Sequence, residues 1–105
     1  MNYIVVTIFP EMFAPFWEHG IIGRAIAAGK ITAGAVNPRE FTNDRHRTTD
    51  DRPFGGGAGM VMKSGPLAGA VRSARRRFPE ALTLLLTPQG RPFDQETALQ
   101  LAGQN

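Results

Sequence analysis

The chain has 105 residues, of which 42% are apolar and 20% are charged, an ordinary composition for one small globular domain with a modest core. It contains no cysteine, which excludes disulfides, thiolate metal sites and a cysteine nucleophile and is consistent with a cytoplasmic protein. The net charge is +3, but without one cluster of four arginines eight basic groups face nine acidic ones, so the basicity is local (Arg72, Arg75, Arg76 and Arg77).

The beginning of the chain is apolar but lacks the basic segment of a signal peptide, and Pro10 and Glu11 interrupt it, so neither a signal peptide nor a membrane span is expected. Residues 3–8 are apolar toward both faces, which is typical of a central strand in a parallel sheet covered by helices. Pro10 suits the first turn of a helix, and we expect that helix to end at Gly20.

The middle of the chain loses its periodicity. A second helix is expected over residues 21–28 and a second strand over residues 31–36. Residues 39–59 are then polar and aperiodic, and a stretch of this length inside a compact domain is usually functional or disordered. Helix signals resume at Ser64 and continue to Phe78.

The arginine cluster lies at the end of this predicted helix. Cations are favourable near a helix C-terminus because of the exposed carbonyl groups there. The same four side chains could instead form a patch that binds phosphates. The sequence leaves both interpretations open.

The last third of the chain predicts a strand and a helix. Residues 82–86 are the second strong candidate for a buried strand, and Asp94 is a good N-cap for a helix over residues 95–102. Strands that alternate with helices predict an α/β fold with a mainly parallel sheet and flanking helices. Three strands are too few to cover both faces of such a sheet, so we expect residues 1–105 to be one incomplete portion of a single domain.

Residues 44–60 have the chemistry of a recognition loop. Four glycines near its end allow the backbone to approach a ligand closely, and arginines can bind phosphates or stack on bases. Aspartates can accept hydrogen bonds from a guanine edge, so the mixture suits an unstacked RNA base. The alternative is a flexible surface loop whose arginines and acidic neighbours pair locally.

Other common sites do not fit this loop. A Walker loop ending at residues 63–64 would need glycine where Met62 stands, and a dinucleotide-binding pattern would need glycine where Met60 stands. His19 and His46 are the only histidines and the aspartates lack the spacing of a calcium loop, so no metal site is expected.

The turn over residues 86–91, with the sequence LTPQGR, follows the second buried strand. Ligands of open α/β sheets bind beyond the carboxyl ends of the strands, and a rigid Pro-Gln-Gly turn could present backbone groups to a purine. An ordinary strand-to-helix turn is the alternative.

Several short motifs follow one another along the chain: FPEMF at 9–13, GRA at 23–25, PREFT at 38–42, DRHR at 44–47, DDRPFGGG at 50–57, GM at 59–60 and TPQGR at 87–91. In this order they resemble the bacterial methyltransferases that modify N1 of the guanosine next to the tRNA anticodon, position 37. The resemblance spans nearly the whole chain. The departures are Ala58, Phe54 and Thr87, which stand where proline, tyrosine and serine are frequent, and each keeps the size or the hydroxyl.

The resemblance implies a SPOUT methyltransferase domain with a trefoil knot, S-adenosylmethionine as methyl donor, tRNA as substrate, and a homodimer whose active sites use both subunits. The cofactor-binding residues that it implies are Leu86, Thr87, Pro88, Gln89 and Gly90. The tRNA-binding residues that it implies are Arg45, His46, Arg47, Asp50, Arg52, Gly55, Gly56, Gly57 and Gly59, of which the first three either contact RNA or hold the loop. We expect the two sets to share one pocket.

Guanine N1 carries a proton, so methyl transfer needs a general base. The base of the family is usually an aspartate in its carboxyl-terminal region, which is expected beyond Asn105, so no catalytic residue is assigned in this chain. We therefore expect that the chain alone does not methylate tRNA. Two alternatives stay open: a small RNA-binding module without catalysis, and a truncated product without activity.

Overall fold

A computed structural model describes residues 1–104. Its centre is a pair of parallel strands, β1 (Asn2–Val6) and β2 (Thr32–Val36), in a register that sets Asn2 opposite Thr32 and Val6 opposite Val36. Between them the chain forms a 3-10 turn, η1 (Pro10–Phe13), and two helices, α1 (Ala14–Glu18) and α2 (Gly20–Ala27). This is the strand, helix and parallel strand order that the sequence predicts.

Two further helices and a small hairpin complete the fold. A 3-10 turn, η2 (Pro38–Phe41), follows β2, and the hairpin strands β3 (Asp50–Asp51) and β4 (Val61–Met62) pair in antiparallel fashion. The long helix α3 (Ser64–Arg77) and the short helix α4 (Gln95–Ala102) lie where the sequence predicts them. Asp94 caps α4 as expected, because its Oδ1 accepts a hydrogen bond from the Thr97 amide at 2.8 Å.

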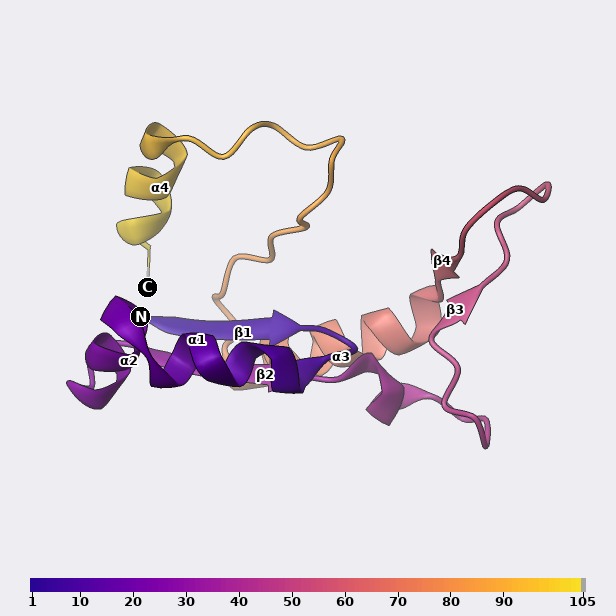
Figure 1. The fold of residues 1–105 in the computed structure, drawn as a ribbon, viewed down its shortest axis with the longest axis horizontal. Coiled ribbons are helices and arrows are strands. Elements are labelled where there is room, and N and C mark those ends of the chain that lie inside the picture. The colour runs from indigo at the N-terminus through magenta and orange to yellow at the C-terminus, as the bar shows by residue number, and fades with distance from the viewer. Residues whose placement is uncertain (105) are drawn as a thin grey trace.

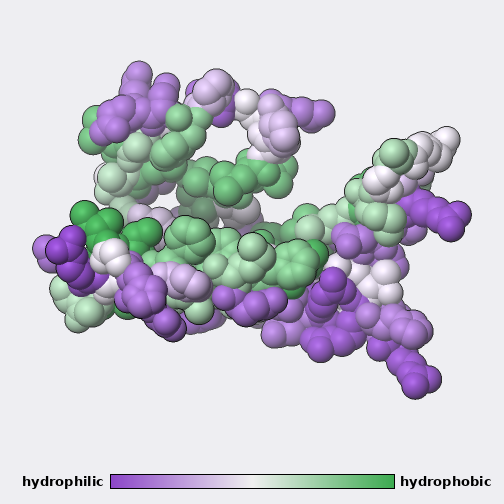
Figure 2. Space-filling model, viewed as in Figure 1, coloured by the Kyte–Doolittle hydropathy of each residue, from purple (hydrophilic) through white to green (hydrophobic). Residues whose placement is uncertain are grey.

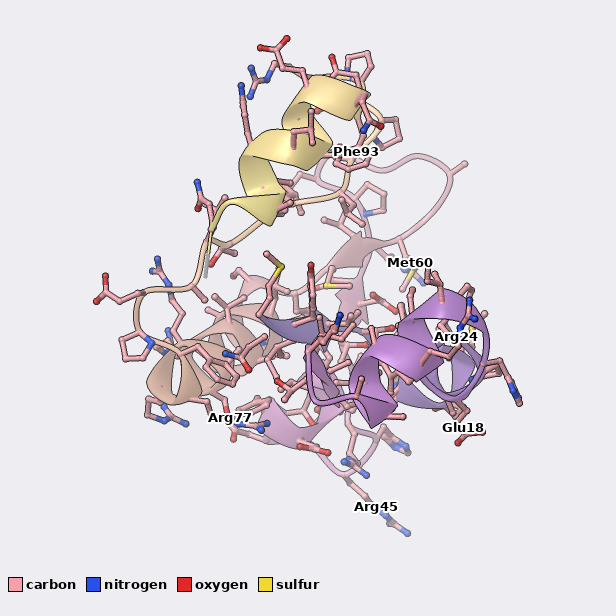
Figure 3. The ribbon with its side chains drawn as sticks, turned by 90° about the vertical axis from the view of Figure 1, so that its left-hand side faces the viewer. Glu18, Arg24, Arg45, Met60, Arg77 and Phe93 are labelled. Carbon is pink, nitrogen blue, oxygen red and sulfur yellow. The ribbon has the colours of Figure 1, made fainter. Side chains whose placement is uncertain are left out.

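The strand pair lies between helices, as an α/β fold requires. Figures 1 and 3 place α1 and α2 on one side of the pair and α3 on the other. The buried apolar side chains are Val36 at the end of β2, Pro38 at the start of η2 and Ala70 in the middle of α3, so the small core lies where these elements meet. The α/β prediction with flanking helices is therefore correct for this part of the chain.

One predicted helix is divided. The sequence predicts a single helix from Pro10 to Gly20, whereas the structure has η1 followed by α1. Pro15 explains the division, because it has no amide hydrogen to donate to the carbonyl group of Glu11 and its ring crowds the preceding turn.

The predicted third strand is wrong. Residues 82–86 run as an irregular extended segment with exposed leucines, and Leu85 and Leu86 are 80% and 93% exposed. A strand is stabilised only when a neighbour pairs with its backbone, and Figure 1 shows this segment in an arm above β1 rather than beside it. For the same reason β1 is only half-buried, although its sequence predicts burial on both faces.

The chain is less compact than a typical globular protein of the same size. Its accessible surface is 8554 Å², against roughly 5,800 Å² for a compact monomer of 11.4 kDa. Its radius of gyration is 15.9 Å, where a compact chain of this length has about 13 Å. The arm that carries α4 and the hairpin that carries β3 and β4 project from the central layers and account for this shape (Figure 1).

The turn η2 packs on α3 at a glycine. A Cβ atom added at Gly69 would lie 2.8 Å from Cβ of Phe41 and 3.0 Å from its ring. Real Cβ atoms do not approach so closely, so only glycine lets the aromatic ring of Phe41 lie against the helix backbone.

We expect Gly69→Ala to destabilise the chain by about 1–3 kcal/mol, because the added methyl group must displace Phe41. Gly65→Ala is the matched control in the same helix, since a Cβ atom there meets nothing within 4 Å. Thermal and urea unfolding followed by circular dichroism measure both variants. Equal stability of the two variants would contradict this view of the η2–α3 contact.

Candidate nucleic-acid and cofactor site

A carboxylate closes the turn that carries the predicted RNA-contacting arginines. Oδ2 of Asp44 accepts the Thr48 hydroxyl at 2.6 Å, and both carboxylate oxygens lie 3.1 Å from the Thr48 amide nitrogen, which donates to them. The Arg47 amide donates to the Asp44 carbonyl oxygen at 3.1 Å. Residues 44–48 therefore form one hydrogen-bonded turn.

Arg47 takes an unusual backbone conformation in this turn. Its φ of +51° lies in the left-handed region, and it is the one non-glycine residue with a positive φ among those that the structure describes. A bulky side chain there costs about 1 kcal/mol or more, so other contacts must hold it in place.

Two arginines supply those contacts. The Arg39 guanidinium donates to the Arg47 carbonyl oxygen at 3.2 Å, and Nε of Arg47 donates to the Arg39 carbonyl oxygen at 3.2 Å. Arg39 is itself fixed in η2, where its amide donates to the Asn37 side chain at 3.0 Å. The turn is thus fastened to η2 through backbone carbonyls, which differs from the local pairing of arginines with carboxylates that the surface-loop alternative describes.

Arg45 and His46 lie at the end of the turn and are exposed. Figure 3 shows Arg45 pointing away from the rest of the molecule. Arg47 is exposed as well, but its Nε is engaged in holding the loop, whereas the side chains of Arg45 and His46 make no hydrogen bond within the described residues.

The glycine-rich segment forms the tip of the β3–β4 hairpin. Asp50 pairs with Met62 and Asp51 with Val61, and the predicted residue Arg52 is exposed just beyond this pairing. The tip consists of glycines with φ between +78° and +130° and with no atom close to the position of a Cβ (Gly55, Gly56, Gly57 and Gly59). L-residues rarely adopt such φ values, so the shape of the tip requires glycine.

The hairpin also exposes apolar side chains. Phe54 is fully exposed and Met60 is 63% exposed. Figure 2 shows the hairpin projecting from the body, with hydrophobic and hydrophilic side chains side by side. Phe54 was not predicted as a site residue, although an aromatic ring beside arginines is a common partner for unstacked bases.

A shallow groove of about 720 Å³ lies behind the turn, between η2 and the first half of α3. Its charged lining residues are Glu40, Asp44, Lys63 and Arg72. The carbonyl oxygen of the buried Thr49 accepts the Lys63 amide at 2.7 Å, which ties the turn and the hairpin to the start of α3.

The predicted cofactor turn is tight. The Gly90 amide donates to the Thr87 carbonyl oxygen at 3.0 Å, and the Gln89 amide donates to the Thr87 hydroxyl at 3.4 Å. The turn borders a cavity of about 360 Å³ between the leucine segment and α4. Of the predicted cofactor residues the cavity is lined by Leu86, Thr87 and Gly90 but not by Pro88 or Gln89, and its other lining residues are Leu84, Leu85, Arg91, Pro92, Phe93, Thr97 and Leu101.

The two predicted sets of residues do not share a pocket within one chain. The groove contains no residue of the cofactor turn, and the second cavity contains none of the residues 44–60. Figure 1 shows the hairpin and the α4 arm projecting from different parts of the molecule. The expectation of one shared pocket is therefore not met by a single copy of the described residues.

Three of the four arginines of the cluster lie away from both segments, whereas Arg72 lines the groove behind the turn. Arg75, Arg76 and Arg77 occupy the last turn of α3, whereas the hairpin joins the first turn. A helix of 14 residues separates its ends by about 20 Å. The Arg77 guanidinium lies 5.7 Å from the centre of the Phe78 ring, as a cation–π contact. The position of these three arginines fits the helix-dipole interpretation.

Residues 1–104 contain no helix that is long and apolar enough to cross a membrane. In the same residues no group of three His, Cys, Asp or Glu side chains is arranged to hold a metal ion.

Comparison with solved structures gives the class of protein. The chain matches the crystal structure of tRNA (m1G37) methyltransferase from Aquifex aeolicus with a TM-score of 0.87 and 30% sequence identity, over 98% of this chain and 46% of that one. The arrangement of strands, helices and hairpin is therefore similar to that of the matching part of this methyltransferase.

Sequence comparison gives the family. The model of "tRNA (Guanine-1)-methyltransferase TrmD" matches residues 1–105. The relatives named tRNA (guanine-N(1)-)-methyltransferase from Desulfatibacillum aliphaticivorans and Marinomonas sp. are 52% and 49% identical over 98% and 99% of this chain. The chain belongs to the tRNA (guanine-1)-methyltransferase family, and it spans 39% and 42% of the length of these two relatives.

Sequence reasoning named Arg47 among the residues that could hold the loop, but it missed Arg39, Asp44 and Thr48. Asp44 and Thr48 have the spacing of a carboxylate that caps a local amide, and the same reasoning identified Asp94 as the cap of α4. The role of Arg39 has no local signal, because its partner Arg47 is eight residues away and in a rare backbone conformation.

The hydrogen bonds from the Thr48 hydroxyl and amide lower the pKa of the Asp44 carboxyl below its ordinary value, with a smaller contribution from the charge of Lys63. A lowered pKa in the folded chain means that the Asp44 contacts favour the ordered turn above the unfolded pKa and are lost as the pH falls through the folded pKa. Carboxyl ¹³C NMR should give an Asp44 midpoint below that of an unstructured aspartate. Thr48→Val should raise it and Thr48→Ser should not; an unchanged midpoint in Thr48→Val would contradict the assignment.

Proposed function

We propose that this chain is the amino-terminal part of a SPOUT enzyme that transfers a methyl group from S-adenosylmethionine to N1 of guanosine 37 in tRNA. The observation that carries the proposal is the family match over residues 1–105, together with a 30% identical methyltransferase structure that superposes on nearly the whole chain. The trefoil knot and the general base are assigned to the part of the enzyme that this chain does not span. Its place of action is the cytoplasm.

The β3–β4 hairpin and the turn over residues 44–48, here named the arginine turn, are proposed to contact the tRNA. Exposed Arg45 and Arg52 can neutralise phosphates, exposed His46 can form hydrogen bonds with the RNA, and the glycine tip allows a base to approach the backbone closely. Asp50 can accept a hydrogen bond from the N2 amino group of a guanine. These residues bind and orient the substrate, and none of them is proposed as the base that removes the N1 proton.

The cavity beside Thr87 is proposed to hold the methyl donor. Its lining is mostly apolar, with Leu84, Leu86 and Phe93 beside the polar atoms of the Thr87–Gly90 turn, and its volume suits a small ligand such as a purine nucleoside. The sulfonium of S-adenosylmethionine supplies an already activated methyl group, so the residues around it need only fix its position. The exposed leucines are proposed to be covered by the rest of the enzyme.

The separation of the two sites supports a homodimer. Methyl transfer requires the guanine and the donor to be adjacent, yet the turn at Thr87 and the hairpin lie in different parts of one chain. We propose that the hairpin of one subunit places the guanine beside the methyl donor that is bound at the cofactor turn of the partner subunit. A second candidate, an RNA-binding module without catalysis, is favoured only by the exposed arginine turn and leaves the second cavity without a role.

The test is a chimaera in which this chain replaces the matching segment of the Desulfatibacillum aliphaticivorans relative. We expect it to methylate a tRNA transcript with G37 and not one with A37, measured by methyl transfer from labelled S-adenosylmethionine and by the primer-extension stop that N1 methylation causes. Gly57→Ala should lower activity by about tenfold or more, because a residue with a φ of +130° tolerates only glycine. A chimaera that folds and binds tRNA but transfers no methyl group would refute the proposal.

The chain alone gives a second prediction. Since the base and the remaining cofactor contacts are assigned outside it, the purified 105-residue chain should yield no methylated tRNA under the same conditions. Cofactor-dependent methyl transfer by the chain alone would show that residues 1–105 contain a base, and the assignment of the catalytic residue would have to change.

A further inference from the structure

The turn over residues 44–48 divides its basic side chains into two groups. All three side chains are exposed, but Nε of Arg47 donates to the Arg39 carbonyl oxygen, 3.2 Å away, whereas no hydrogen bond within the described residues engages the side chains of Arg45 and His46. A ligand can therefore reach Arg45 and His46 without breaking any hydrogen bond of the turn.

The two side chains follow a carboxylate that is bound within the turn itself. Asp44 precedes Arg45 directly and binds both the amide and the hydroxyl of Thr48, which fixes the two ends of the turn against each other. Without this contact, the left-handed conformation of Arg47 would be held by the two hydrogen bonds with Arg39 and by the backbone hydrogen bond from the Arg47 amide to the Asp44 carbonyl oxygen.

We propose that Asp44 is a positioning residue for RNA binding: its contacts with Thr48, together with the reciprocal Arg39–Arg47 hydrogen bonds, hold Arg45 and His46 in the orientation that meets the RNA backbone. The inference rests on the proposed tRNA substrate and adds to it which basic residues touch the RNA and which only hold the turn. Prior ordering raises affinity because the cost of fixing the turn is met before the RNA binds.

Simple electrostatics predicts the opposite sign for Asp44. Removing a negative charge next to two arginines should tighten the binding of a polyanion. If Asp44 positions the turn, Asp44→Ala should instead weaken RNA binding. We expect a loss of affinity of about three- to tenfold, because the turn must then become ordered when the RNA binds. The direction of the change therefore distinguishes the two views.

The experiment measures the affinity of the whole 105-residue chain for a fluorescent tRNA anticodon stem–loop by anisotropy, over a range of salt concentrations. The matched control is Glu40→Ala, which removes the same charge from an exposed side chain in η2 and should leave the affinity unchanged or slightly higher. Thr48→Val should resemble Asp44→Ala, and Thr48→Ser should restore the affinity because it keeps the hydroxyl.

Substitutions of Arg45 and Arg47 should have different effects, because Arg45 is proposed to contact the RNA and Arg47 to hold the turn. Arg45→Ala should reduce the slope of log affinity against log salt by about one, because a phosphate contact is lost, while the NMR signal of the Thr48 amide stays in place. Arg47→Ala should shift that amide signal as Asp44→Ala does. Circular dichroism with retained α3 helicity confirms that each variant is folded.

The outcomes distinguish this inference from the proposed function. Equal or tighter binding by Asp44→Ala overturns the positioning role, even if the chimaera methylates G37. Weaker binding by Asp44→Ala in a chain whose chimaera transfers no methyl group supports the positioning role and refutes the enzyme. Absence of RNA binding by the unsubstituted chain overturns the inference.

Discussion

The packing of Phe41 on the backbone of α3 at Gly69 is the contact on which this arrangement depends. It joins η2 to the longest helix, and η2 in turn carries Arg39, which fastens the arginine turn. The same helix covers the strand pair with Ala70, one position further along the chain. A single turn of α3 therefore connects the core to the candidate RNA-binding loop, so the position of that loop is set by the fold and not by the loop alone.

The elements that depend on local chemistry could be predicted from the sequence. The strands β1 and β2 follow from their apolar runs, α3 and α4 from helical periodicity, and the start of α4 from the capping carboxylate of Asp94. The leucine run at residues 82–86 was predicted as a strand because composition reveals a preference for pairing but not whether a partner is within reach. Its exposure reflects the absence of a neighbouring strand in residues 1–104 rather than a weak local preference.

The two segments of the candidate site could be predicted from the sequence, but their positions relative to each other could not. Glycines 55, 56, 57 and 59 do take backbone conformations that other residues avoid, and the Thr87–Gly90 turn is as tight as its sequence suggests. The sequence could not reveal that the two segments lie in separate parts of the chain, because that depends on the path of the arm that carries α4. Nor could the sequence distinguish the role of Arg45 from that of Arg47, because both are arginines. They differ in that only Arg47 has a backbone carbonyl, that of Arg39, within hydrogen-bond distance of its side chain.

The uncovered leucine run has a consequence for biosynthesis and handling. A stretch rich in leucine and free of charge, with its backbone unpaired, is a nucleus for cross-β aggregation whenever it stays exposed. Arg75, Arg76, Arg77 and Glu80 precede it and Arg91 follows it, so charges stand on both sides in the manner of gatekeepers that disfavour stacking of identical segments. The basic end of α3 would then keep the chain dispersed, independently of any contact with RNA.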